Sequence, residues 1–183
     1  AEMPVLAPAS IQDVLDYGMI GWELSRYSGL WTSMICLADT MDSGAVVELG
    51  MHRYVTVRPA DFVLPEGGVG LRIGDTPLAK EKRLREIKLP AAQAFVRANG
   101  LDKVLLQGKG KRLGIVVAGQ AARDVFEALG AIGLSPEQAA DLGVSIFKAA
   151  MPWPLEPQAI TRFCRGFERV LVALRIADRV IPR

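Results

Sequence analysis

The second half of the chain alternates between short apolar runs and stretches with helical spacing of apolar residues. The apolar runs occupy residues 113–118, 144–150 and 169–174. Continuous runs of this length, separated by helices, predict parallel strands buried on both faces, so we expect an α/β fold with a βαβαβ unit. Ligands and partners contact such sheets at the carboxyl ends of the strands, which here are residues 119–120 and 151–156.

The first part of the chain, residues 9–43, has mainly helical spacing. Ser10 is a suitable N-cap for a helix that follows it. Glycines interrupt this pattern, and glycine inside a helix costs about 1 kcal/mol relative to alanine. The pattern therefore predicts close helix packing or a break near Gly29, and a second helix over residues 30–41.

The middle of the chain carries weaker signals. Two short apolar runs, residues 46–49 and 54–57, predict strands. Residues 58–78 are rich in proline and glycine, which is typical of an irregular connection. Residues 78–99 have a helical pattern that is interrupted at Pro90.

Composition limits the possible functions. Half of the 183 residues are apolar, 23% are charged, and the formal net charge is +2, so the chain has no strongly basic surface for nucleic acid. We expect no signal peptide and no membrane span, because no apolar run approaches the roughly 18 residues that a span requires. The isolated cysteines Cys36 and Cys164 are predicted to be buried free thiols of a cytoplasmic protein. The single histidine, His52, is predicted to be a surface or structural histidine rather than a ligand or a catalytic base.

The candidate functional residues fall in three places, and each has a plain structural alternative. The strand-to-helix turn at Gly119-Gln120 could present backbone N–H groups to an anion, but a structural turn is favoured because no Gly-x-Gly-x-x-Gly or phosphate-loop motif is present. Trp153, between two prolines, suits either a domain interface or a packing loop. The cluster at residues 25–31 suits an aromatic substrate, a domain contact or a buried helix junction. The candidate residues for an interface or a substrate approach are Arg26, Tyr27, Trp31, Gly119, Gln120 and Trp153.

These segments resemble a known family. Residues 25–33 and 38–43, the connection at 61–68 and 75–79, and residues 113–116 with 151–157 are similar in order to the indolepyruvate ferredoxin oxidoreductases, in their long fused form. The resemblance spans essentially all 183 residues. It departs from the family at Gln120, where a small or hydroxylic residue is common, and in the tail at 175–183.

The resemblance implies a three-part organisation. Residues 1–57 would be the end of a pyrimidine-type thiamine domain, 58–109 a connector with a helical stretch, and 110–183 a parallel-sheet domain similar to the C-terminal domain of transketolase. The chain would thus be an internal part of a longer polypeptide. Its partners would be the remaining domains of the same enzyme, in a homodimer.

The activity implied is the oxidative decarboxylation of aryl pyruvates, including indolepyruvate, to acyl-CoA with reduction of ferredoxin. The full enzyme would use thiamine diphosphate, magnesium and iron–sulfur clusters, whereas no catalytic, cofactor or metal residue is assigned to this chain, which lacks a Gly-Asp-Gly motif. We therefore expect the isolated chain to be inactive. Two alternatives stay open: a free-standing doubly wound module that binds a nucleotide or flavin, and a non-catalytic assembly subunit.

Overall fold

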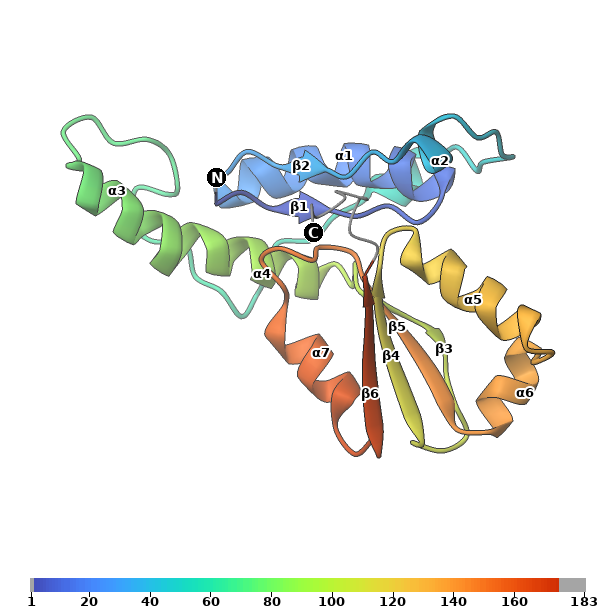
Figure 1. The fold of residues 1–183 in the computed structure, drawn as a ribbon. Coiled ribbons are helices and arrows are strands. Elements are labelled where there is room, and N and C mark those ends of the chain that lie inside the picture. The colour runs from blue at the N-terminus through green and yellow to red at the C-terminus, as the bar shows by residue number, and fades with distance from the viewer. Residues whose placement is uncertain (1, 175–183) are drawn as a thin grey trace, which may run out of the picture.

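The computed structural model describes residues 2–174 and centres on a four-stranded sheet in the order β3-β5-β4-β6 (Figure 1). Its strands are β3 (Lys103–Leu106), β4 (Leu113–Ala118), β5 (Val144–Ala149) and β6 (Arg169–Leu174). Strands β4, β5 and β6 are parallel, and β3 is antiparallel to β5. The predicted α/β class and parallel strands are confirmed, while the sequence pattern gave no sign of β3. The departure from the family noted at 175–183 lies outside the described residues.

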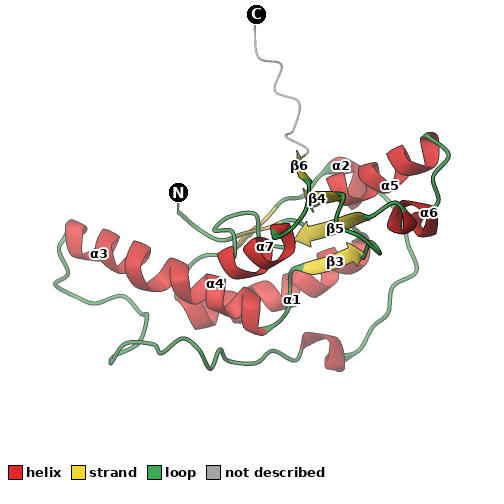
Figure 2. Ribbon diagram, turned by 90° about the horizontal axis from the view of Figure 1, so that it is seen from below, coloured by secondary structure: helices red, strands yellow, loops and turns green. Residues whose placement is uncertain are grey.

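Helices cover both faces of this sheet (Figures 1 and 2). They are α5 (Ala121–Ala131) and α6 (Pro136–Asp141) on one face and α7 (Pro157–Cys164) on the other. Because neighbouring residues of a strand point to opposite faces, Val117 and Ile146 pack with α5 and α6, whereas Val116 and Phe147 pack with α7. Burial on both faces explains why these strands have continuous apolar sequences.

A second, smaller βαβ unit forms the N-terminal layer. Its elements are β1 (Val5–Leu6), α1 (Ile11–Ser28) and β2 (Ser33–Met34), followed by the short helix α2 (Ala38–Met41). The Ser10 side chain accepts a hydrogen bond from the Asp13 amide and begins α1, as the sequence predicted. Strands β1 and β2 pair in parallel.

Helix α1 ends at Gly29, so the predicted helix over 30–41 is wrong. Gly29 has a φ of +67°, and a Cβ atom there would lie 2.6 Å from the Val69 carbonyl oxygen. The left-handed conformation stops the helix, and the chain continues extended to pair with β1. Only α2, at the end of this segment, is helical.

The predicted helix at 78–99 is a continuous helical run of three parts, which extends from the left toward the centre of Figure 2. They are α3 (Pro77–Arg83), a π-helical segment (Leu84–Lys88) and α4 (Leu89–Ala98). Pro90 has no N–H to donate within a regular α-helix, and the widened π turn lies just before it. The interruption predicted at Pro90 is therefore a local change of helix type.

The two strands predicted at 46–49 and 54–57 are absent. This part of the chain is irregular apart from a 3-10 turn at Met51–Tyr54. We call residues 44–62 the strap, because they run past α1 and α4 as a long loop that side chains of these helices hold (Figure 2). Their apolar residues gave a strand-like pattern, but no neighbouring strand lies beside them among the described residues.

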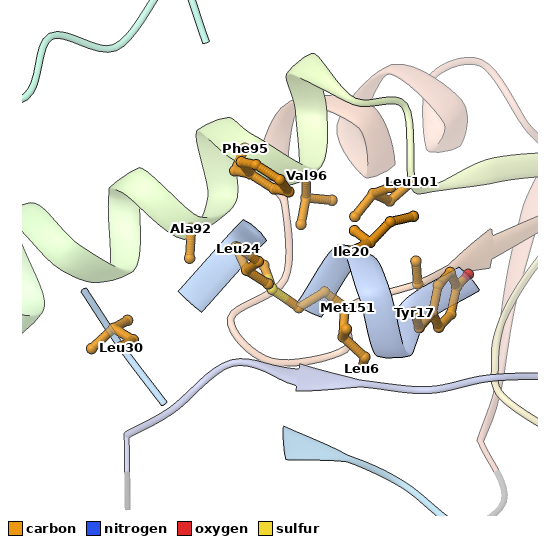
Figure 3. Packing of buried hydrophobic residues seen from close by; sticks show 11 residues of the cluster. Leu6, Tyr17, Ile20, Leu24, Leu30, Ala92, Phe95, Val96, Leu101 and Met151 are labelled. Carbon is orange, nitrogen blue, oxygen red and sulfur yellow. The ribbon is translucent and has the colours of Figure 1, made fainter. Parts of the chain in front are cut away.

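The core between the layers draws on distant parts of the chain (Figure 3). Leu24 of α1, Phe95 and Val96 of α4, Leu6 of β1 and Met151 after β5 are all at most 2% exposed and form one cluster. Burial of apolar side chains on this scale is the main stabilising term in folding. The three-part division made from the sequence stays a prediction, and this cluster contains residues from all three parts.

Neither the two cysteines nor the single histidine is fully buried. Cys36 is exposed and Cys164 is half-buried against the α7 side of the sheet, so the prediction of two buried thiols is wrong. Cys36 follows β2 rather than lying inside a packed helix, which explains its exposure. His52 is exposed as predicted, with a ring nitrogen 3.1 Å from Glu48.

Candidate functional site

The carboxyl ends of β4 and β5 are covered by the chain's own N-terminal segment. The Val5 amide donates to the Trp153 carbonyl over 2.7 Å, and the Ala7 amide donates to the Ala150 carbonyl over 2.9 Å. At the end of β4, Gly119 has a φ of +55°, and a Cβ there would lie 3.5 Å from Ala7. The edge at which open α/β sheets bind ligands is thus occupied by protein.

A buried ion pair lies beneath this segment. The Lys148 ammonium at the end of β5 is 2.7 Å from Oδ2 of Asp13 in the first turn of α1, and the Lys148 side chain is 6% exposed. The same Asp13 oxygen accepts the Ala9 amide, and Lys148 Nζ lies 5.4 Å from the centre of the Tyr17 ring. A buried charge of this kind requires such partners, so the pair fixes α1 to the sheet.

Asp102 joins the helical layer to the end of β5. Its Oδ1 accepts the Ala150 amide over 2.8 Å, while its Oδ2 is buried without a hydrogen-bond partner among the described residues. Burial raises the pKa of Asp102 to about 6, and the nearby Glu156 carboxylate adds to the rise, although the Ala150 hydrogen bond and Lys148 oppose it. The Tyr17 hydroxyl is also buried, with no hydrogen-bond partner within residues 2–174, and burial raises the pKa of Tyr17. The polar groups at this edge are therefore only partly satisfied.

The predicted site residue Gln120 has a structural contact. Its side chain is 7% exposed and accepts a hydrogen bond from the Thr40 hydroxyl over 3.2 Å. This contact joins α2 to the turn between β4 and α5. It supports the structural interpretation of the Gly119-Gln120 turn over an anion site.

The loop after β5 leaves Trp153 half exposed, and its peptide bond to Pro154 is cis. The loop ends at Glu156, which is fully buried and accepts the Gln158 and Ala159 amides at the start of α7. The Arg97 guanidinium donates to Glu156 over 2.8 Å and to Asp61 of the strap over 2.6 Å. Arg97 therefore links the sheet, α4 and the strap.

The strap is held by side chains of α1 and α4. The Gln12 amide group bonds to both the N–H and the C=O of Glu48, and Asn99 does the same for Val57. Arg53 makes a two-pronged ion pair with Asp16 of α1, with contacts of 2.6 and 3.1 Å. Burial raises the pKa of Asp16, but the hydrogen bonds from Arg53 and Gln12 outweigh it and lower the pKa below its ordinary value.

The predicted cluster at residues 25–31 is split by the end of α1. Arg26 is exposed and pairs with Glu23, and Tyr27 packs on Phe95 with ring centres 5.7 Å apart. Trp31 is 86% exposed. Tyr27 and Trp31 do not share a helical face, because α1 ends before Trp31. Their role at an interface remains a prediction.

Trp31 lies beside a largely apolar groove of about 810 Å³ between α1 and the strand β2. We call it the α1–β2 groove. Its lining includes Gly18, Gly21, Trp22, Arg26, Thr32 and Met34.

Several residues of this region had little or no sequence signal. Lys148 was the exception, because it is a charged residue inside an otherwise apolar run. Its partner Asp13 is 135 residues away, and Asp102 and Glu156 had no pattern to mark them. Periodicity shows which segments are buried, but it does not show which distant side chains meet.

The donor set does not fit the cofactors implied by the resemblance. Among residues 2–174, no three His, Cys, Asp or Glu side chains are grouped so that they could hold a metal ion. Two cysteines are too few for the four thiolates of a typical iron–sulfur cluster.

Within residues 2–174, no helix is both long and apolar enough to cross a membrane.

Comparisons with known proteins bear on this arrangement. Residues 103–175 match the model of the indolepyruvate oxidoreductase domain family. The chain is 26% identical over 185 residues to "Indolepyruvate oxidoreductase subunit IorA" of Methanothermobacter marburgensis, covering 100% of this chain and 28% of that protein. Its similarity to the IorA subunit of Methanothermobacter thermautotrophicus is 25% over 183 residues, covering 99% of this chain and 27% of that protein.

A solved structure shows the same fold. It is the 2-oxoglutarate:ferredoxin oxidoreductase of Magnetococcus marinus, with 2-oxoglutarate, coenzyme A and succinyl-CoA bound, which matches with a TM-score of 0.51 and 15% identity over 93% of this chain and 34% of that chain. The chain thus shares the fold of part of that solved structure. The sequence matches confirm the resemblance: residues 103–175 match the family model, and the chain is similar over essentially its whole length to part of the two IorA subunits. It spans about 28% of the length of the curated relatives.

Proposed function

We propose that this chain is the framework segment of an enzyme that oxidatively decarboxylates aryl pyruvates to acyl-CoA and transfers the electrons to ferredoxin. In this role it joins the end of a thiamine-type domain to a sheet domain similar to the C-terminal domain of transketolase. The full enzyme would be a cytoplasmic homodimer carrying thiamine diphosphate, magnesium and iron–sulfur clusters. The similarity to the two IorA subunits over essentially the whole chain supports the reaction class.

The observation that carries the framework role is the covered edge of the sheet. Residues 5 and 7 donate backbone hydrogen bonds to the segment after β5, and the Lys148–Asp13 ion pair lies under them. A sheet that binds a nucleotide keeps this edge free for the ligand. The covered edge therefore favours a structural role over the alternative of a free-standing nucleotide- or flavin-binding module.

The proposal is tested by assaying the purified chain for dye reduction with indolepyruvate, thiamine diphosphate, magnesium and CoA. We expect no activity, because the reaction needs the cofactor's reactive carbon and an electron relay, and the described residues supply neither a metal site nor enough thiolates. Dye reduction that depends on indolepyruvate would contradict the proposed role.

A binding measurement separates the alternatives. We expect calorimetric titration of the chain with FMN, FAD, NAD or ATP to give no heat of binding. Stoichiometric binding of any of these would favour the nucleotide- or flavin-binding module. A non-catalytic assembly subunit would instead be a separate chain that forms a stable complex with the catalytic polypeptide.

A further inference from the structure

The carboxyl edge of the main sheet is covered, and the opposite, amino edge is basic. Two segments, residues 109–112 and 162–169, lie along this amino edge at the lower end of Figure 1. Because the whole chain has a formal net charge of only +2, these segments hold an excess of positive charge that the total hides. Glu168 is their single acidic residue. We call the surface formed by their six exposed cationic side chains the basic edge: Lys109, Lys111, Arg112, Arg162, Arg165 and Arg169.

Direct contacts join the two segments of the basic edge. The Arg169 amide donates to the Arg112 carbonyl over 3.3 Å. The Lys111 ammonium donates to the Arg165 carbonyl over 2.8 Å. Arg162 lies one turn before Arg165, in the last turn of α7. The cationic side chains of both segments therefore belong to one continuous surface.

The arginines of the basic edge differ from others in the chain because they have no ion pairs in the part of the chain that the structure describes. Arg53, for comparison, pairs with Asp16 at 2.6 Å. At the basic edge, Lys109 pairs with Asp141, but none of the four arginines has a carboxylate partner among residues 2–174. A guanidinium group is a planar fork of N–H donors that matches the geometry of a carboxylate. Four neighbouring groups of this kind are thus available to another molecule.

A role in helix stability explains only part of this cluster. Arg162 and Arg165 lie at the carboxyl end of α7, where positive charge interacts favourably with the negative end of the helix dipole. Arg112 precedes strand β4 and Arg169 begins strand β6, and strands have only small net dipoles. The helix dipole therefore does not account for the basic edge as a whole.

The surroundings of the basic edge favour carboxylates of a protein over phosphate groups. Phosphate sites are commonly built on the N–H groups of a helix N-terminus, whereas α7 presents its carboxyl end here. The Lys111 ammonium lies 5.7 Å from the centre of the half-buried Phe167 ring. An open hollow of about 430 Å³ beside Arg165 is lined in part by Ile160 and Cys164. Arginine combined with aromatic and apolar side chains is typical of protein–protein interfaces.

We propose that the basic edge docks an acidic protein, whose Asp and Glu side chains pair with Arg112, Arg162, Arg165 and Arg169. The partner approaches the sheet from the end opposite to the covered carboxyl edge, so it does not compete with the N-terminal segment. Complementary charge steers such a partner to this edge, and salt weakens the attraction by screening it. The inference does not depend on the reaction proposed above.

The test uses an oligoglutamate peptide as the acidic probe, titrated into the isotope-labelled chain and followed by the amide signals in NMR spectra. We expect saturable shifts at residues 111–112 and 162–169. The dissociation constant should be at least about 10-fold weaker at about 0.15 M than at about 0.01 M ionic strength, because salt screens exposed charges. Absence of shifts at these residues, or shifts of equal size over the whole chain, would overturn the inference.

Two double variants with the same change in net charge sharpen this test. Arg162→Glu with Arg165→Glu should weaken peptide binding at least about 10-fold, because like charges then face each other. Arg58→Glu with Arg123→Glu, at exposed arginines of the strap and α5, should change it by less than about twofold. Equal weakening in both would show a general effect of net charge and overturn the inference.

Neutral substitutions keep the test valid if the glutamate variant does not fold. Arg165 contributes its backbone carbonyl to the Lys111 contact, so the fold does not need its side chain there. Arg162→Gln with Arg165→Gln should keep the wild-type midpoint of thermal unfolding and still weaken peptide binding. Wild-type binding by this folded variant would overturn the inference.

Other ligands are distinguished by the same amide signals. Tighter binding of a uridine oligonucleotide than of the peptide at the basic edge would indicate a nucleic-acid surface and overturn the inference. Saturation by inorganic phosphate with the same shifts would indicate a small-anion site and overturn it too. Shifts at the basic edge that grow with the concentration of the chain alone would show that a second copy covers this edge, which would also overturn the inference.

Discussion

Strand β5 and the strap are held in place by different groups. Strand β5 is paired on both sides through backbone hydrogen bonds, and all six of its residues are buried. The strap is paired through the side chains of Gln12, Asp16, Asn99 and Arg97, while Val46, Leu49 and Val55 along it are more than 70% exposed. Cooperative burial thus holds one region, and a few separate side-chain contacts hold the other.

The difference implies two kinds of stability. Loss of a contact in the sheet should affect the whole fold, because the strands share one core. Loss of a contact in the strap should open the strap locally and leave the sheet unchanged. The substitutions below test this contrast, from the largest expected effect to the smallest.

Replacing a buried residue of β5 should have the largest effect. Ile146 is fully buried, and Ile146→Ala should lower the free energy of unfolding by about 3–4 kcal/mol, because it leaves a cavity in the sheet. Val55→Ala in the strap, at a residue 76% exposed, should change it by less than about 0.5 kcal/mol. Urea denaturation measures both, and similar losses would contradict the contrast.

Asp102 should make the junction between the layers sensitive to pH. Its pKa is raised to about 6 from an ordinary value of 3.8, so the native state favours the protonated form. The stabilisation is therefore fully present below about pH 4 and is lost as the pH rises through 6, by up to about 3 kcal/mol at 1.36 kcal/mol per pKa unit.

The variant Asp102→Asn isolates this effect, because it cannot ionise and still accepts the Ala150 amide. Urea denaturation between pH 4 and 8 should show that the variant gains stability relative to the wild type as the pH rises. A constant difference between the two proteins would show that Asp102 does not titrate in this range.

Glu156, at the start of α7, is linked through Arg97 of α4 to Asp61 of the strap. Glu156→Gln should lower the free energy of unfolding by about 2 kcal/mol, because the buried Arg97 contact loses its negative partner. Glu127→Gln, at an exposed position of α5, is the control and should have little effect. Equal unfolding midpoints for the two variants would show that the Arg97–Glu156 pair contributes nothing.

Gln12 should affect the strap alone. Gln12→Ala removes both hydrogen bonds to Glu48, so the Glu48 amide should exchange at least about 10-fold faster while the free energy of unfolding falls by less than about 1 kcal/mol. Gln158→Ala on the exposed surface of α7 is the control. A global loss of several kcal/mol on Gln12→Ala would contradict a locally held strap.

The same contrast explains which elements the sequence predicts. The strands β4, β5 and β6 and the cap at Ser10 follow from local patterns, because apolar runs and capping residues act over a few positions. The strap was mistaken for two strands because its partners are 36 to 42 residues away and are side chains. Strand β3 was missed because Lys103, Val104 and Leu105 are exposed at a sheet edge and have no clear alternation.

The candidate site divides in the same way. The carboxyl edge of the sheet follows from the order of strands and helices, so Gly119, Gln120 and Trp153 were placed at the correct edge. The segment that covers this edge and the Lys148–Asp13 pair depend on contacts between the two ends of the chain. No pattern within one segment contains that information.

Hydrogen exchange across the whole chain, resolved by residue, tests the contrast most directly. The account predicts that the amides of Ile115, Val117 and Ile146 exchange slowest, near the rate set by global unfolding. Strap amides should exchange orders of magnitude faster, with Glu48 and Val57 slower than their neighbours because Gln12 and Asn99 accept from them. Strap amides as slow as those of Ile115 and Val117 would contradict the account.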